Sequence, residues 1–215
     1  MQSKSKKIEQ GDATRETLLL AARELFGVRG YTETSLDEIV RSAGVTKGAL
    51  YHHFTSKEEL FRCVFELVKK EVSYEAFPPT FGQDNAELWL DLLARCRRFI
   101  EAHTDPRVHR IVLLDARSVL TWDEWHKVEN EYGVVMLRFG LRRAINRGII
   151  RPLPLHALTM ILTGALNEAC MLVANAADHT SALDEASAII EQLLEGLRPR
   201  PPAELDGARS EEHQR

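Results

Sequence analysis

Apolar residues recur at the spacing of one helix face along almost the whole chain, and no segment alternates apolar and polar residues as a half-buried strand does. The pattern therefore predicts an all-α fold. Its first helix runs from Asp12 to about Arg29, and Gly30 is expected to end it. The polar residues 1–11 before it are expected to form a flexible arm. The apolar face of this helix comprises Leu18, Ala21, Ala22, Leu25 and Phe26.

Three further helix starts follow within about 25 residues. Ser35 and Glu38 have the S-x-x-E spacing of a capping box, and this helix is expected to stop at Gly44. Thr46 is a good N-cap for a short helix that ends near Phe54. The spacing of the capping box then recurs at Ser56 and Glu59, where a longer helix begins.

The rest of the chain predicts a larger helical part. Thr121 and Glu124 form another capping box, and Gly148 marks the end of the longest helix. The expected helices cover about residues 56–74, 86–103, 106–120, 122–147, 154–176 and 183–197, which gives about nine in all. The expected organisation is a flexible arm at 1–11, a small helical domain at 12–56, a larger helical domain at 57–198, and a disordered tail at 199–215.

Composition limits the class of protein. The chain has 215 residues, 44% of them hydrophobic and 28% charged, which are the proportions of an ordinary globular protein. The net charge of −4 argues against a polycation that coats nucleic acid, so any nucleic-acid role must be local. Cys63, Cys96 and Cys170 lie far apart without C-x-x-C spacing, which argues against a disulfide framework and a structural zinc site.

No apolar stretch follows the first lysines, so we expect no secretory signal and a cytoplasmic protein. The most apolar run, ALTMILTGALNEACMLVA, is interrupted by Asn167 and Glu168. We interpret it as a buried helix and expect no membrane partner.

One short segment changes its charge balance. Residues 41–57 contain Arg41, Lys47 and Lys57 together with two histidines, but no carboxylate. Two helices joined by a tight glycine-containing turn, with a third helix beside them, are typical of a helix-turn-helix, whose second helix enters the major groove of DNA.

The spacing of the second helix separates a buried side from an outward side. Leu50 and Phe54 are expected to face back onto the preceding helix. The outward side then carries Lys47, Gly48, Tyr51 and His52.

Gly48 is informative because glycine weakens a helix but lets the backbone come close to a partner surface. The backbone N–H groups at helix starts capped by Ser35, Thr46 and Ser56 are natural phosphate ligands. A lone glycine can also relieve crowding between helices, and paired histidines are often merely solvated. The coincidence of these features in one turn-flanked segment favours DNA binding.

The segment TSLDEIVRSAGVTKGALYHHFTSKEEL, residues 34–60, resembles the DNA-binding signature of the TetR family of bacterial transcriptional regulators. RETLLLAARELFGVRGYTETS ahead of it resembles the first helix of that family. The resemblance implies a homodimeric repressor that binds a palindromic operator and leaves it when a small, largely apolar effector binds. Carried onto this chain, it implies DNA contacts by Ser35, Thr46, Lys47, Gly48, Tyr51, His52 and Lys57.

The helix at 154–176 is apolar nearly all round, and small residues such as Gly164, Ala165 and Ala169 would allow close approach of another helix. In proteins of the resembling family the last two helices form a four-helix dimer interface, and the helices at 154–176 and 183–197 suit that role. A core within one subunit is the alternative. Thr159, Thr163 and Asn167 draw a polar line that could bond across the dimer, line a pocket or hold water.

Large or adaptable side chains on the middle helices are candidates for an apolar effector pocket, although most such residues in proteins are plain core. No cofactor and no metal are expected. The candidate effector residues are Trp89, Cys96, Trp122, Trp125, Met136, Phe139, Asn167 and Met171.

An enzyme and a helical scaffold are the two alternative classes of function. An enzyme is disfavoured because the sequence has no G-x-G-x-x-G, P-loop, G-x-S-x-G or H-E-x-x-H motif. His126 and Glu129 could share a metal, but their segment WHKVENE resembles a solvated helix face. A helical scaffold would have no need of a carboxylate-free surface.

Overall fold

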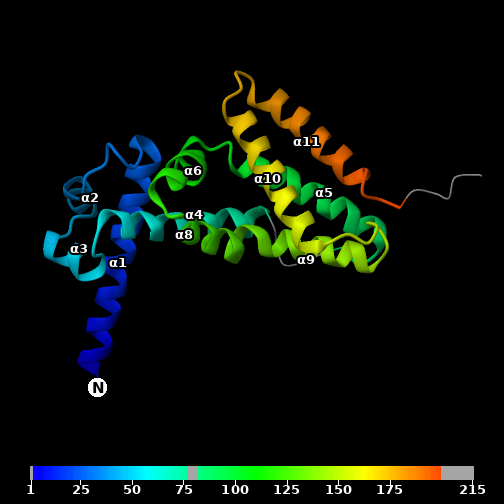
Figure 1. The fold of residues 1–215 in the computed structure, drawn as a ribbon. Helices are drawn as coiled ribbons and strands as arrows, with labels where there is room; N and C mark the ends of the chain where they lie inside the picture. The colour runs from blue at the N-terminus through cyan, green and yellow to red at the C-terminus, as the bar shows by residue number, and fades with distance from the viewer. Residues whose placement is uncertain (1, 77–81, 200–215) are drawn as a thin grey trace, which may run out of the picture.

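The computed structural model describes residues 2–76 and 82–199, and every regular element in these ranges is a helix. The first three helices gather at one end of the molecule (Figure 1). They are α1 (Gln2–Arg29), α2 (Leu36–Ala43) and α3 (Lys47–His53). We call them, with the start of α4, the head. Helix α4 (Lys57–Ala76) leaves the head and runs into the larger body formed by the remaining helices.

The prediction of a flexible arm at residues 1–11 is wrong for residues 2–11. Helix α1 begins at Gln2 rather than at Asp12. Residues 2–10 contain neither proline nor glycine and are rich in lysine, glutamine and glutamate, which are good helix formers. The helix therefore continues in the N-terminal direction, away from the rest of the head (Figure 1). Of the predicted tail, residues 200–215 lie outside the described residues.

The body follows the expected helices with two local changes. Each of the two long middle helices contains one π-helical stretch, and the last helix begins at His179 because the Asp178 side chain accepts hydrogen bonds from the amides of Thr180 and Ser181. The elements are α5 (Asn85–Ala102), α6 (Pro106–His109), η1 (Arg110–Asp115), α7 (Ala116–Val119), α8 (Trp122–Val128), η2 (Glu129–Gly133), α9 (Val134–Asn146), α10 (Leu155–Ala174) and α11 (His179–Glu195).

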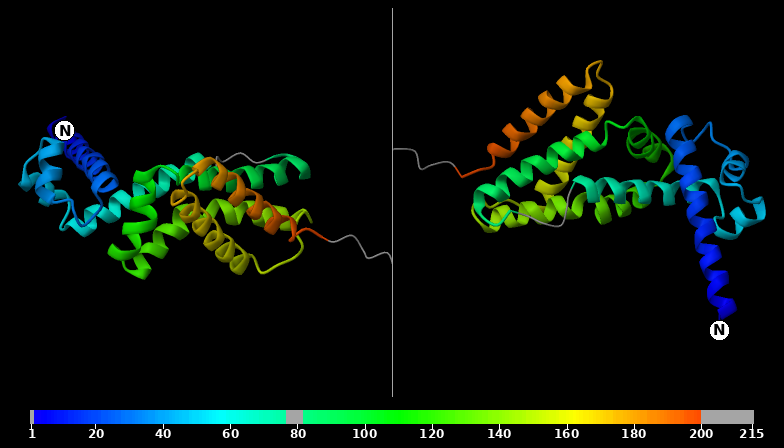
Figure 2. Two further views of the ribbon diagram at one scale, coloured as in Figure 1. Left: turned by 90° about the horizontal axis from the view of Figure 1, so that it is seen from above. Right: turned by 180° about the vertical axis from the view of Figure 1, so that it is seen from behind.

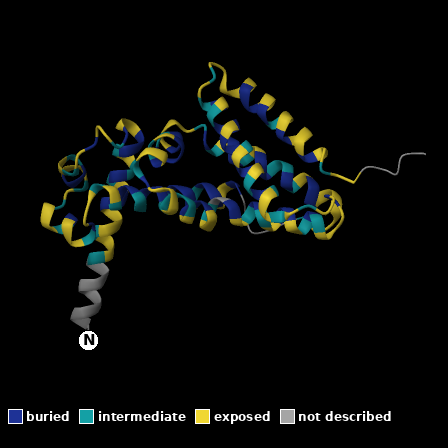
Figure 3. Ribbon diagram, in the orientation of Figure 1, coloured by how far each residue is buried: buried dark blue, intermediate teal, exposed yellow. Residues whose placement is uncertain are grey.

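The core is continuous from head to body. In the head, the Phe26 ring meets the Phe61 ring edge-on with centroids 5.2 Å apart, and Phe61 is on α4. Further along α4, Phe65 and Val72 are buried against the body. The inner faces of the helices are buried and their outer faces exposed in both parts (Figure 3). Helix α4 thus belongs to both cores.

Helix α10 crosses the body and packs against α5, α9 and α11 (Figure 2). Among the described helices it alone is long and apolar enough to cross a membrane, but 44% of its apolar stretch is buried within the structure. The core helix of a soluble protein can be equally long and equally apolar. The packing agrees with the interpretation of this segment as a core helix.

Candidate DNA interface and effector domain

The turn between α2 and α3 has the geometry that the sequence predicts. The Ser35 hydroxyl accepts a hydrogen bond from the Glu38 amide, and the Glu38 carboxylate accepts one from the Ser35 amide over 2.9 Å, which completes the capping box. Gly44 has φ +66°, the left-handed conformation that suits glycine at the end of a helix. Thr46 then caps α3 by accepting from the Ala49 amide. These contacts fix the direction in which α3 leaves the turn.

Helix α3 presents one buried and one exposed side. Leu50 is fully buried, whereas Lys47, Gly48, Tyr51 and His52 are exposed together on the outer side. Tyr51 keeps 57% of its surface exposed and is therefore free to contact a partner. The structure therefore brings four of the seven predicted DNA contacts onto one short helix face. Ser35 and Thr46 are exposed at the adjoining helix starts.

Nothing in the described part of the chain requires a glycine at position 48. A Cβ atom built there would have one neighbour within 4 Å, the Thr46 hydroxyl oxygen at 3.9 Å. The alternative that Gly48 relieves crowding against a neighbouring helix is therefore wrong. Because alanine would fit and would favour the helix, the glycine points to a requirement from outside the chain.

Two lysines of the predicted interface already have contacts in the head. The Lys47 ammonium lies 2.7 Å from a carboxylate oxygen of Asp37, and this hydrogen bond and the charge of Asp37 raise the pKa of Lys47. The Lys57 ammonium lies over the Tyr31 ring, 4.2 Å from its centroid, and burial lowers the pKa of Lys57. Lys47 is thus displayed on the surface, whereas Lys57 is folded back against the head. The sequence did not reveal either contact.

The capping box predicted at the start of α4 forms only in part. The Ser56 hydroxyl accepts from the Glu59 amide over 3.1 Å, as expected. The Glu59 carboxylate, however, accepts from the amide and the hydroxyl of Thr55 instead of returning to Ser56. Two residues, Thr55 and Ser56, therefore bond to Glu59 at the start of α4, whereas the sequence predicted that Ser56 alone would do so.

Comparison with known proteins identifies this arrangement. Residues 18–64 match the family described as bacterial regulatory proteins, tetR family. Residues 89–197, half of the chain, match the tetracyclin repressor-like C-terminal domain. The chain belongs to the TetR family. Members of this family are DNA-binding transcription factors, so the chain belongs with regulators and not with enzymes.

Individual relatives agree with the family assignment. The chain is 30% identical over 132 residues to the transposon Tn10 TetC protein of Escherichia coli, covering 61% of this chain and 66% of that protein. It is 41% identical over 76 residues to the regulator AcrR of Shigella flexneri, covering 33% of this chain and 35% of that protein. The chain thus spans between a third and two thirds of the length of these relatives.

A solved structure gives more complete coverage. A TetR-family transcriptional regulator from Pectobacterium atrosepticum is 33% identical to this chain, with a TM-score of 0.73. The alignment covers 90% of this chain and 98% of that one. The all-α fold with an N-terminal helix-turn-helix, predicted from the sequence, is therefore confirmed for this TetR-family chain.

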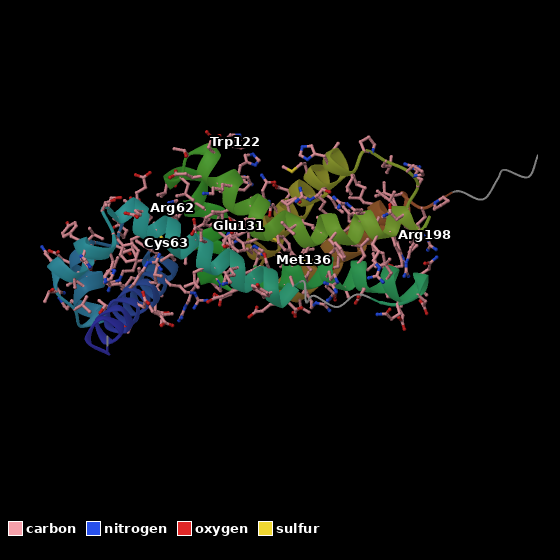
Figure 4. The ribbon with its side chains drawn as sticks, turned by 90° about the horizontal axis from the view of Figure 1, so that it is seen from below. Arg62, Cys63, Trp122, Glu131, Met136 and Arg198 are labelled. Atoms are coloured by element: carbon pink, nitrogen blue, oxygen red, sulfur yellow. The ribbon has the colours of Figure 1, made fainter. Side chains whose placement is uncertain are left out.

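The predicted effector residues occupy three kinds of environment. Trp89, Cys96 and Asn167 are buried, while Trp125, Met136 and Met171 are half-buried. Trp122 and Phe139 instead face outward, and Trp122 is 72% exposed. Figure 4 shows Trp122 at the outer edge of α8, well away from Met136. The structure therefore does not gather the whole set around one internal space.

The body has a hollow of about 240 Å³ between α5 and α11. Cys96 is the one predicted effector residue among its lining side chains, and the ion pair of Arg97 and Asp184 lies at the same place. The remaining lining residues are Leu93, Ala94, Ser187, Ala188, Ile190 and Glu191. Most of the predicted set has no part in this hollow.

The polar line along α10 is satisfied within the helix itself at two of its three positions. The Thr159 hydroxyl donates to the Leu155 carbonyl oxygen over 2.7 Å, and the Thr163 hydroxyl donates to the Thr159 carbonyl oxygen over 2.9 Å. Both threonines are buried. Their hydroxyls therefore need no bond across a dimer, no ligand and no water, contrary to the options that the sequence left open.

A buried ion pair lies in the centre of the body. The Lys69 ammonium on α4 and a Glu129 carboxylate oxygen on η2 are 2.8 Å apart, and the two side chains are 1% and 2% exposed. The interpretation of WHKVENE as a solvated face is therefore wrong for Glu129. Glu129 begins the π-helical stretch η2 and points inward, where its carboxylate pairs with Lys69 on α4. One turn further along α4, the Ser73 hydroxyl donates to the Tyr132 carbonyl oxygen on η2 over 2.7 Å.

Head and body meet at a joint that also contains polar contacts. The Tyr31 amide donates to Asp115 at the end of η1 over 2.8 Å. Glu24 on α1 pairs with Arg107 on α6 over 2.7 Å. Helix α1 packs directly against α6 and η1. A movement of η1 or α4 would therefore be transmitted to the head.

Proposed function

We propose that the chain is a transcriptional repressor that binds an inverted-repeat operator as a homodimer and leaves it when a small effector enters the body. The observation that carries the proposal is the exposed face of α3, where Gly48 has open space in place of a side chain. Phosphate contacts would come from Lys47 and from the helix starts at Ser35 and Thr46, with Tyr51 and His52 facing the groove.

The proposed working parts follow the predicted organisation. Residues 12–56 would bind DNA, and residues 57–198 would bind the effector and a second subunit. The Lys57 side chain is folded against the Tyr31 ring. It would contact a phosphate that lies beside the head. A DNA-binding regulator of bacterial genes would act in the cytoplasm, where its operator is.

Operator binding tests this proposal through two neighbouring charges. Lys47→Ala should weaken binding to specific and random DNA alike and lower the slope of log affinity against log salt by about one. Asp37→Asn should strengthen binding, because it removes the carboxylate that pairs with Lys47 and repels phosphates. The affinity is measured by fluorescence anisotropy over a salt series with the inverted repeat upstream of the gene.

Arg97→Gln, on the outer surface of the body, is the control and should leave affinity and salt slope unchanged. Equal affinities of the Lys47→Ala variant, the Asp37→Asn variant and the unmodified protein would contradict the α3 interface. Binding to every DNA sequence with the same affinity would contradict the repressor role.

The homodimer is proposed from apolar side chains that the subunit leaves exposed. Ile161 and Leu172 on α10 and Ile189 and Leu193 on α11 are each more than half exposed. The two helices contact each other, and on each helix the two exposed residues are spaced to lie on one face. Exposed apolar area of this kind is typical of a subunit interface. A second copy of the same surface would bury it.

Charging this surface tests the dimer. Ile161→Glu with Leu193→Glu should give monomers at micromolar concentration in sedimentation velocity, because each dimer would bury four carboxylates. Leu20→Glu, at an exposed leucine of α1, is the matched control and should remain dimeric. A dimer that survives the double substitution would place the interface elsewhere.

A further inference from the structure

The centre of the body contains a carboxylate that is only half satisfied. Glu129 is paired with Lys69 through Oε2, whereas its Oε1 is buried and has no hydrogen-bond partner among the described residues. Buried polar atoms in proteins are almost always bonded. An oxygen of a carboxylate accepts hydrogen bonds, so this position calls for a donor.

A second unsatisfied acceptor is present at His103, the residue that directly follows α5. His103 is fully buried, and its Nδ1 lies 2.7 Å from the carbonyl oxygen of Phe99. Because a carbonyl oxygen only accepts, Nδ1 carries the hydrogen, which leaves Nε2 with a free lone pair in the neutral ring. Burial, with the charge of Lys69 as a smaller cause, lowers the pKa of His103 to about 3, so the ring is neutral at physiological pH. Nε2 has no hydrogen-bond partner in the described part of the chain.

These groups share their neighbours. The Phe99 ring lies 5.6 Å from the Lys69 ammonium and 4.5 Å from the His103 ring, centroid to centroid in the second case. Burial raises the pKa of the Cys170 thiol on α10 to about 12, and Lys69 and Glu129 are close enough to affect it. Lys69 on α4, Glu129 on η2, Cys170 on α10 and His103 at the end of α5 therefore lie in one buried neighbourhood around Phe99.

We propose that Lys69, His103 and Glu129 are the polar anchor of the effector site and that the effector is a neutral molecule with an apolar body and at least one hydroxyl donor, as in a phenol. The inference deepens the proposed function and rests on it. A donor is required because both unsatisfied atoms are acceptors. A neutral molecule is favoured because Lys69 and Glu129 already neutralise each other, so a charged effector would leave a net charge buried in the body.

Binding at this anchor would act on the element that connects head and body. A hydroxyl that donates to Oε1 of Glu129 would share the carboxylate with Lys69, which bonds Oε2, and would weaken the hold of the carboxylate on the ammonium. Lys69 is on α4, and the neighbouring Ser73 holds the same helix to η2. The effector would therefore change the contact between η2 and α4 without touching the head.

The proposal is tested by calorimetric titration of the full chain, without DNA, with four probes of similar shape. Phenol should bind at least about tenfold more tightly than toluene, because the hydroxyl satisfies a charged or buried acceptor. Benzylamine and benzoate should bind more weakly than phenol. Toluene, benzylamine or benzoate binding as tightly as phenol would overturn the proposal, as would absence of phenol binding at millimolar concentration.

Variants locate the anchor. His103→Phe and the double variant Lys69→Met with Glu129→Leu should each reduce the preference for phenol over toluene, and the double variant keeps the fold by removing both charges together. Asp184→Asn, beside the hollow between α5 and α11, is the control and should keep the preference. An unchanged preference in the first two variants would overturn the assignment. Operator affinity is measured separately, so loss of DNA binding with intact phenol binding would contradict the repressor and not the anchor.

Discussion

The backbone N–H of Tyr31 donates a hydrogen bond of 2.8 Å to the Asp115 carboxylate, across 84 positions of sequence. Tyr31 directly follows Gly30, whose φ of +86° turns the chain out of α1. Asp115 lies at the end of η1, which packs on both α1 and α4. One carboxylate therefore holds the first turn of the head against the body.

Removing that carboxylate should loosen the joint. Asp115→Ala should lower the free energy of unfolding by about 1–3 kcal/mol, because it leaves a half-buried amide without its charged acceptor. Asp184→Ala breaks an exposed ion pair with Arg97 and should cost less than about 1 kcal/mol. Urea unfolding measures both. Equal losses for the two variants would show that the Tyr31 bond contributes no more than a surface pair.

Two glycines of the head should respond to alanine in opposite directions. Gly48→Ala should raise stability by up to about 1 kcal/mol, because the site has room and alanine favours the helix, while operator affinity falls. Gly44→Ala should lower stability by about 1–2 kcal/mol, because φ there is +66°. Thermal unfolding and operator titration on the same samples measure both effects. A Gly48→Ala protein that keeps full operator affinity would remove the evidence for close DNA approach.

The buried ion pair should show strong coupling. Glu129→Leu alone should cost about 3–5 kcal/mol of stability because it strands a buried ammonium, and adding Lys69→Met should recover most of the loss. Arg23 and Glu71 provide a control pair with the same 2.8 Å separation but 40% exposure of each side chain. The coupling energy of that pair in a double-mutant cycle should stay below about 1 kcal/mol. Equal coupling in both pairs would contradict the prediction.

His103 should make stability depend on pH in the acid range. Its pKa is about 3 in the folded protein against an ordinary value of 6.5, so between these values the unfolded chain binds the extra proton. Stability should therefore be complete above about pH 6.5 and fall as the pH drops toward 3, by up to about 1.4 kcal/mol per pH unit from this group. His103→Phe should remove that part of the slope between about pH 6 and pH 4. Parallel curves of unfolding free energy against pH for the variant and the unmodified protein would contradict this prediction.

Local signals in the sequence predicted local structure well. The capping boxes at Ser35 and Thr121, the N-cap at Thr46 and the stop at Gly44 are all present, because each depends on residues within one turn of one another. The same locality explains why the face of α3 could be predicted. Its buried and exposed sides are set by helical spacing over only seven residues.

Contacts between distant segments could not be read in this way. Asp37 is ten positions from Lys47, and Glu129 is sixty from Lys69, so no periodicity links either pair. One signal was available. Lys69 follows the buried Phe65 by four residues, and a lysine on an apolar stripe implies a buried partner.

The π-helical stretches explain why the position of Phe139 could not be predicted from the sequence. A π-turn adds about one residue to a helical turn, which rotates the following faces by about 100°. Faces assigned from a regular helix over residues 122–147 are therefore displaced beyond η2. Phe139, which follows η2, is half exposed. Trp122 precedes η2, and the structure offers no such explanation for its exposure.

Helix α4 contains no glycine and no proline over its 20 residues, so it has no point at which it would bend by itself. A helix of that length is about 30 Å long. It therefore acts as a lever between the centre of the body and the head. A tilt of only about 5° at one end moves the other by about 2.6 Å, comparable to the length of a hydrogen bond. In a dimer the two displacements would add, and the distance between two recognition helices could become wrong for one turn of DNA without any change in either head.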